Sequence, residues 1–131
     1  MLETGLARVV YVVDADAAVR EGLSRLVDSA GLEAKPYEGL EEFLLQVPEG
    51  HGACALLDLP ASMREPALLA RLRATAAVLP IIALSADDDP EMRRVAREIG
   101  AQAFFRKPVD AAALLDSIEW VMLTDLRGDP I

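Results

Sequence analysis

The chain has 131 residues, with 13 basic and 22 acidic side chains and a formal net charge of -9 at pH 7. This length suits one domain, and a hydrophobic content of 53% is enough for a full core and too high for a disordered chain. The negative charge argues against direct binding of nucleic acid, because the phosphate backbone would be repelled.

The cysteine content, the length of the apolar runs and the N-terminus exclude further classes of protein. The single cysteine, Cys54, excludes an intramolecular disulfide and a multi-cysteine metal site. No apolar run approaches the roughly 20 residues of a membrane span, and the N-terminus lacks a basic segment followed by an apolar one. We therefore expect a soluble, cytoplasmic, single-domain protein that makes no contact with a membrane.

Apolar runs alternate with segments of helical spacing in the first half of the chain. Residues 8–13 are β-branched and too continuous for a half-exposed strand, which predicts burial on both faces. Gly31 is a typical stop after a helix, and Pro48 with Gly50 ends a second helix. In chain order we expect a strand at 8–13, a helix at 19–30, a weaker strand at 32–37 and a short helix at 40–47.

The same alternation continues to the C-terminus. Asp89 and Pro90 form an N-cap and first-turn pair for a fourth helix, and Asp110 caps a fifth. The apolar stripe of this last helix, Leu114 to Met122 with Trp120, is expected to face the core, and an interface is the alternative. The expected elements are a strand at 53–57, a helix around 66–72, a strand at 80–84, a helix at 90–99, a strand at 102–105 and a helix at 111–122.

Five strand-helix units of this kind predict a doubly wound α/β fold, with a parallel sheet covered by helices on both faces. Ligands of such folds bind outside the carboxyl ends of the strands. Polar residues do follow the predicted strands, and they are Asp14, Asp16, Asp58, Ser85 and Lys107.

These residue types suit phosphoryl chemistry. Carboxylates that converge from different strand ends are good ligands for Mg²⁺, and a carboxylate can itself be phosphorylated to an acyl phosphate. The hydroxyl of Ser85 and the ammonium group of Lys107 would then bind phosphoryl oxygens. Lys107 is one of only two lysines in the chain.

In this arrangement the sequence resembles the response-regulator receiver (CheY-like) domain of two-component signalling. The residues that carry the resemblance are Asp14, Asp58, Ser85 and the Lys107-Pro108 pair, in order at four predicted strand ends. The FixJ-like subgroup is most similar, through Val12-Val13-Asp14 and Ala18-Val19-Arg20. The resemblance covers residues 8–124, implies a five-stranded sheet of order 2-1-3-4-5, and leaves 125–131 as a tail or the start of a linker.

The resemblance also implies a role for each matching residue. Asp58 would be the phosphoacceptor, Ser85 the switch hydroxyl and Lys107 the lysine that bridges to the phosphoryl group. Asp14 and the backbone carbonyl of Pro60 would hold Mg²⁺ together with Asp58, and Phe104 would be the aromatic residue whose rotation reports phosphorylation. Such a domain is a signalling module rather than an enzyme.

Partners follow from the same resemblance. The phosphodonor would be a sensor histidine kinase or a phosphotransfer protein, and the signal would pass to an output domain or a partner protein. The surface formed by residues 90–120 is the one that receivers use for dimerisation or for output contacts, so a homodimer through it is one possibility.

Three departures from the family pattern bear on mechanism. The second member of the acidic pair is Ala15, whose side chain has no oxygen to offer a metal. Asp16 either compensates for it or caps the first helix, and we favour the cap. Pro60 keeps its carbonyl but lacks the N–H that would bind a phosphoryl oxygen. Ser62 also replaces a proline usual in the family, which predicts an altered loop after Asp58.

These departures predict an atypical receiver in which Mg²⁺ is held weakly or not at all and phosphorylation is impaired. The alternative is a fully phosphorylatable receiver, since Asp58, Ser85 and Lys107 are all retained. A remote alternative is an aspartyl phosphatase of the haloacid-dehalogenase type, because Asp14-Ala15-Asp16 matches its Asp-x-Asp signature.

Overall fold

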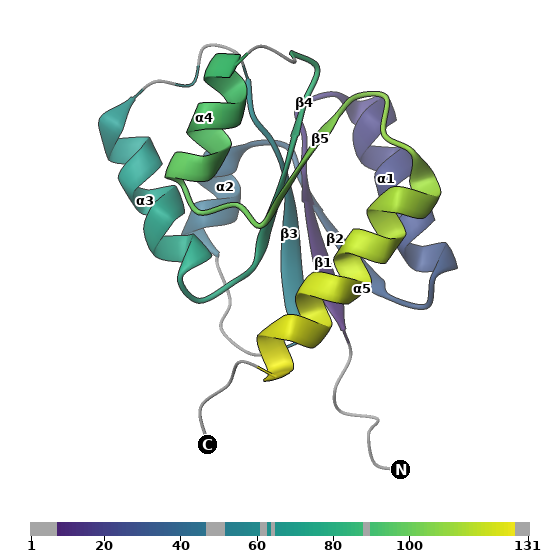
Figure 1. The fold of residues 1–131 in the computed structure, drawn as a ribbon. Helices are drawn as coiled ribbons and strands as arrows, with labels where there is room; N and C mark the ends of the chain where they lie inside the picture. Colours follow the sequence, from purple (N-terminus) through teal and green to yellow (C-terminus); the bar gives the residue numbers. More distant parts are fainter. Residues whose placement is uncertain (1–7, 47–51, 61–62, 64, 88–89, 128–131) are drawn as a thin grey trace.

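The computed structural model describes residues 8–46, 52–60, 63, 65–87 and 90–127. Five parallel strands form one sheet of order β2-β1-β3-β4-β5 (Figure 1), which confirms the predicted topology. The strands are β1 (Val9–Val13), β2 (Glu33–Tyr37), β3 (Ala53–Asp58), β4 (Ile81–Ser85) and β5 (Ala103–Arg106). The helices are α1 (Ala17–Ser29), α2 (Leu40–Leu45), α3 (Pro66–Ala76), α4 (Pro90–Glu98) and α5 (Ala111–Arg127).

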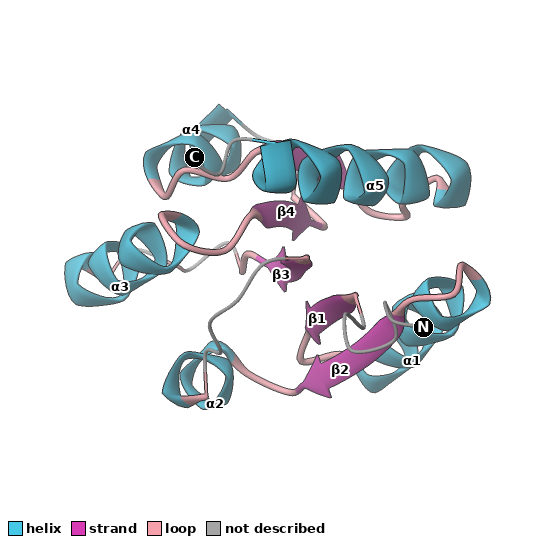
Figure 2. Ribbon diagram, turned by 90° about the horizontal axis from the view of Figure 1, so that it is seen from below, coloured by secondary structure: helices cyan, strands magenta, loops and turns pink. Residues whose placement is uncertain are grey.

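Helices cover both faces of the sheet (Figure 2), with α1 and α5 on one side and α2, α3 and α4 on the other. The alternation of side chains along each strand supplies both cores. In β1, Tyr11 and Val13 enter the core under α2, α3 and α4, while Val10 and Val12 enter the core under α1 and α5. This two-sided burial explains why residues 9–13 are continuously apolar.

The weaker second strand lies at an edge of the sheet, paired with β1 alone. Its residues are exposed or only partly buried, and it contains Lys35 and Pro36. Charge and proline are typical of edge strands because they discourage pairing with another chain. Edge position therefore accounts for the weak hydrophobic signal of this segment.

Helix α5 differs from its sequence-based prediction in two respects. It continues to Arg127, beyond the expected core limit of 124. Trp120 was expected in the core, and this is wrong, because its side chain is 59% exposed. Among residues 111–123 of this helix, the buried ones are Leu114, Ile118, Val121 and Met122, and Trp120 lies two positions after Ile118 and so on another face.

Helix α2 ends at Leu45, before the expected end at 47. Several other expectations lie outside the described residues, namely the stop residues Pro48 and Gly50, the altered loop at Ser62, the cap Asp89 and the tail beyond 127. The cap Asp110 is confirmed, because its Oδ2 accepts a hydrogen bond from the Ala113 N–H at 2.9 Å. Among the described residues, no helix combines the length and apolar character needed to cross a bilayer.

Candidate functional site

The polar residues at the strand ends come together at one edge of the sheet. Parallel register places the end of β1 beside β3, the Asp58 end of β3 beside β4, and Ser85 beside Arg106 of β5. An open pocket of about 530 Å³ results. Its lining residues are Asp14, Ala15, Asp16, Asp58, Leu59, Pro60, Ser85, Ala86, Asp87 and Lys107.

The ammonium group of Lys107 connects the two central carboxylates. Its Nζ donates to Asp14 Oδ2 at 2.6 Å and to Asp58 Oδ1 at 2.7 Å. The Asp14 side chain is 2% exposed, that of Lys107 16% and that of Asp58 22%. Asp58 is thus the carboxylate that solvent reaches more easily, while Asp14 is more deeply buried.

Burial and charge change the titration of this group. Burial raises the pKa of Asp58, the hydrogen bond from Lys107 lowers it, and the charge of Asp14 raises it, so that the net change is upward. For Lys107, burial lowers the pKa, but the hydrogen bonds and charges of both carboxylates outweigh it and the net pKa is raised. Lys107 therefore stays charged, and Asp14 and Asp58 share its ammonium group as their cation.

Asp14 is held by two further contacts at the end of β1. Its Oδ1 accepts a hydrogen bond from the Asp16 N–H at 2.9 Å. The Arg20 guanidinium donates to the Asp14 carbonyl oxygen at 2.8 Å. This contact was not predicted from the sequence, because it depends on the geometry of the turn between β1 and α1, the helix that carries Arg20.

Asp16 caps helix α1. Its Oδ1 accepts hydrogen bonds from the Ala18 N–H at 2.9 Å and the Val19 N–H at 3.2 Å. This geometry satisfies two N–H groups that have no partner within the helix, and it matches the interpretation favoured from the sequence. A metal contact by Asp16 stays a prediction.

We expect Asp16→Ala to lower the free energy of unfolding by about 1 kcal/mol, because the cap is lost. Asp16→Asn should change it far less, since an asparagine oxygen accepts the same two hydrogen bonds. Urea denaturation of the two variants beside the parent chain measures the difference. Equal losses in both variants would contradict a capping role.

Ser85 is buried, at 1% exposure, and its hydroxyl lies in a local turn. The Ser85 Oγ accepts a hydrogen bond from the Asp87 N–H at 3.0 Å, and the Ser85 carbonyl accepts one from the Lys107 N–H at 2.9 Å. The second contact ties the loop that carries Lys107 to the end of β4. The peptide bond between Lys107 and Pro108 is cis.

The donor set fits a divalent cation only in part. Ala15 lines the pocket and supplies no oxygen, and the carbonyl of Pro60 already accepts a hydrogen bond from the Met63 N–H at 3.0 Å. Within the described ranges, no cluster of three or more Asp, Glu, His or Cys side chains has the placement of a metal site. Asp14, Asp58 and the Pro60 carbonyl are the groups that would hold such an ion.

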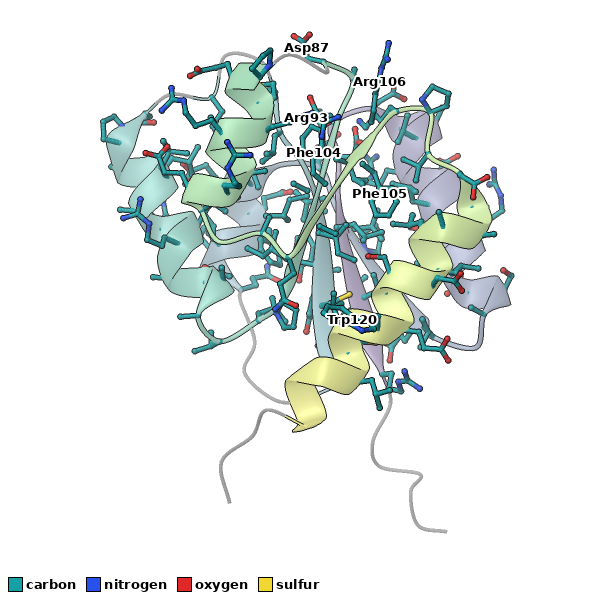
Figure 3. The ribbon with its side chains drawn as sticks, viewed as in Figure 1. Asp87, Arg93, Phe104, Phe105, Arg106 and Trp120 are labelled. Carbon is teal, nitrogen blue, oxygen red and sulfur yellow. The ribbon has the colours of Figure 1, made fainter. Side chains whose placement is uncertain are left out.

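Phe104 is not one of the residues that line this pocket. It is partly buried on β5 and packs against the core under α2, α3 and α4. The Arg93 guanidinium carbon lies 5.0 Å from the centre of its ring. Figure 3 shows Arg93 of α4 beside this ring, a contact that was not predicted from the sequence.

Comparison with known proteins agrees with this geometry. The family model described as "Response regulator receiver domain" matches residues 10–119. The transcriptional regulatory protein TdiR of Thauera aromatica is 36% identical over 118 residues, which cover 88% of this chain and 52% of TdiR. The transcriptional regulatory protein FixJ of Bradyrhizobium diazoefficiens is 31% identical over 115 residues, which cover 84% of this chain and 54% of FixJ.

A solved structure shows the same fold. The response regulator StyR superposes with a TM-score of 0.75 and 35% identity, over 92% of this chain and 62% of StyR. The chain spans about half the length of the curated relatives it matches.

These matches cover nearly the whole sheet and every strand end of the pocket. They decide against a haloacid-dehalogenase phosphatase, and they agree with the FixJ-like character of the first strand and helix. The chain belongs to the response regulator receiver domain family, the CheY-like signalling domains of two-component systems.

Proposed function

We propose that this receiver domain accepts a phosphoryl group on Asp58, and that the reaction is impaired relative to a receiver with a complete acidic pair. The observation that carries the first part is the Lys107 ammonium group, which lies 2.7 Å from Asp58 Oδ1 in an open pocket. A fixed cation beside the acceptor is suited to the charge that a phosphoryl group brings.

In the transfer, an Asp58 carboxylate oxygen forms a bond to phosphorus as the bond between phosphorus and the donor's leaving group breaks. The bonding electrons depart with that leaving group, and Asp58 becomes an acyl phosphate. Lys107 would shift its hydrogen bond from the carboxylate to a phosphoryl oxygen. The hydroxyl of Ser85, whose oxygen accepts from the Asp87 N–H, would donate its proton to a second phosphoryl oxygen.

The second part rests on Ala15 and Pro60. A divalent cation, when bound, supplies charge neutralisation for the transferring phosphoryl group. Ala15 removes one carboxylate from the set that would hold it, which leaves Asp14, Asp58 and the Pro60 carbonyl. Pro60 also has no N–H to offer a phosphoryl oxygen, a loss of about 1–3 kcal/mol in a buried site.

A protein phosphodonor, either a sensor histidine kinase or a phosphotransfer protein, suits the surface beside Asp58. Lys107 also lines an apolar groove of about 370 Å³ between α1 and the loop before α5. Val19, Leu23 and Leu26 supply the α1 wall of this groove. Because the groove adjoins the acceptor pocket through Lys107, a donor seated in it would hold its phosphoryl group near Asp58.

The signal would leave through an output domain or a partner protein. TdiR and FixJ are transcriptional regulators of which the match covers only 52% and 54%, which supports an output of that kind. Trp120 is 59% exposed at the end of the face formed by residues 90–120, which favours a contact on that face, a homodimer included. With a net charge of -9, the chain itself is not suited to direct contact with nucleic acid.

The test is the intact mass of the protein after incubation with a small-molecule phosphodonor, over a series of Mg²⁺ concentrations. We expect a single phosphoryl adduct that forms slowly, requires high Mg²⁺ and is absent from Asp58→Asn. Asp116→Asn, which alters an exposed residue of α5, is the matched control and should keep the adduct.

Other outcomes would change the conclusion. Rapid, complete phosphorylation at low Mg²⁺ would establish the fully phosphorylatable alternative. An adduct that persists in Asp58→Asn, or none even at high Mg²⁺, would contradict Asp58 as the acceptor. The last result would indicate a domain that signals through protein contacts alone.

A further inference from the structure

Phe104 occupies a position between the acceptor pocket and helix α4. It is three residues before Lys107 on an edge strand, and it pairs with Ala83 of β4. Two residues later, Arg106 pairs with Ser85, the hydroxyl residue of the pocket. The strand therefore connects the Phe104 ring to both phosphate-binding groups of the site over a short stretch of backbone.

The ring is held from two sides. On the inner side it packs against the core that contains Met92 and Val95 of α4. On the outer side is Arg93, whose guanidinium carbon is 5.0 Å from the ring centre (Figure 3). This distance is within the range of about 6 Å at which a cation is attracted to the face of an aromatic ring.

The neighbouring arginine has a different contact. Arg94 donates to both carboxylate oxygens of Glu91, at 2.8 and 2.7 Å, within the same helix. Arg94 thus contributes to the surface of α4, whereas Arg93 reaches across to another element. The contact of Arg93 with Phe104 joins α4 to β5.

We infer that Arg93 is a positioning residue in the unphosphorylated domain. It holds the Phe104 ring in the orientation seen here, in which the ring packs against α4. Attraction of a cation to an exposed ring face changes the ratio of two ring orientations by roughly two- to fivefold. If the ring rotates, Arg93 loses this contact, so the pair opposes rotation. The statement that the Arg93 contact opposes a switch linked to phosphorylation rests on the proposed function. The statement that Arg93 holds the Phe104 ring in the unphosphorylated domain does not.

The experiment uses fluorine NMR of protein labelled with para-fluorophenylalanine. The chain has three phenylalanines, Phe43, Phe104 and Phe105, so each resonance is assigned by one Phe→Leu variant. The test variants are Arg93→Met, which keeps side-chain length without charge, and Arg93→Lys, which keeps the charge. Arg97→Met removes the same charge one turn later on α4 and is the matched control.

We expect Arg93→Met to shift the Phe104 resonance and leave those of Phe43 and Phe105 in place. Arg93→Lys should restore part of the shift, and Arg97→Met should cause none. An unchanged Phe104 resonance in Arg93→Met, or an equal shift in the Arg97 variant, would overturn the inference. All spectra are recorded without phosphodonor on variants with native urea midpoints, so a failure of phosphorylation at Asp58 leaves the result unaffected.

Discussion

Ala15→Asp is expected to raise the rate of Mg²⁺-dependent phosphorylation of Asp58 by about tenfold or more. Ala15 lines the acceptor pocket and is exposed, so an aspartate fits there without displacing core residues. It would add a third carboxylate to the set formed by Asp14 and Asp58. A tenfold change corresponds to about 1.4 kcal/mol of barrier, which is modest for one added ligand of a catalytic metal.

The measurement is the initial rate of adduct formation by intact mass, at several Mg²⁺ concentrations. Ala15→Asn introduces a side chain of nearly the same size as aspartate without its charge, and it should leave the rate close to that of the parent. Asp58→Asn in the Ala15→Asp background should abolish the adduct. If Ala15→Asp matches the parent at every Mg²⁺ concentration, the missing carboxylate does not limit the reaction. The double variant with Ala15→Asp and Pro60→Asn then separates the contribution of Pro60.

Lys107→Met is expected to lower the free energy of unfolding by about 1–3 kcal/mol, measured by urea denaturation without added metal. The Lys107 ammonium contacts Asp14 at 2.6 Å and Asp58 at 2.7 Å, and its removal leaves two carboxylates facing each other without a cation. The estimate lies below that for a fully buried ion pair, because Asp58 keeps 22% of its side-chain surface exposed.

Lys35 is the only other lysine of the chain, and Lys35→Met on the exposed edge strand is the control, with little expected effect. The loss in Lys107→Met should also depend on pH. Folding raises the pKa of Lys107 above its ordinary value of 10.5, so its contribution is fully present below that pH. It is lost as the pH rises through the folded value. Equal stability of the two lysine variants, or a difference between them that grows above pH 10.5, would contradict the ion-pair role.

Much of the fold is determined by the sequence alone. The β-branched run at 8–13 and the apolar runs before Asp58 and Ser85 each predict a doubly buried strand, because a sheet with helices on both faces leaves no position for polar residues. The order of Asp14, Asp58, Ser85 and Lys107 at strand ends follows from the same alternation. Parallel strands then bring these residues to one edge, so the composition of the pocket could be predicted before its geometry.

The tertiary structure decided which of these groups are in contact. No sequence pattern pairs Lys107 with Asp14 across 93 positions, or Arg93 with Phe104, because such contacts depend on how separate loops and elements pack. Packing also decided the exposure of Trp120. When the apolar stripe of a helix is wide, a residue at its edge can face either the core or solvent. Local periodicity determines the elements, whereas contacts between side chains distant in sequence depend on the assembled fold.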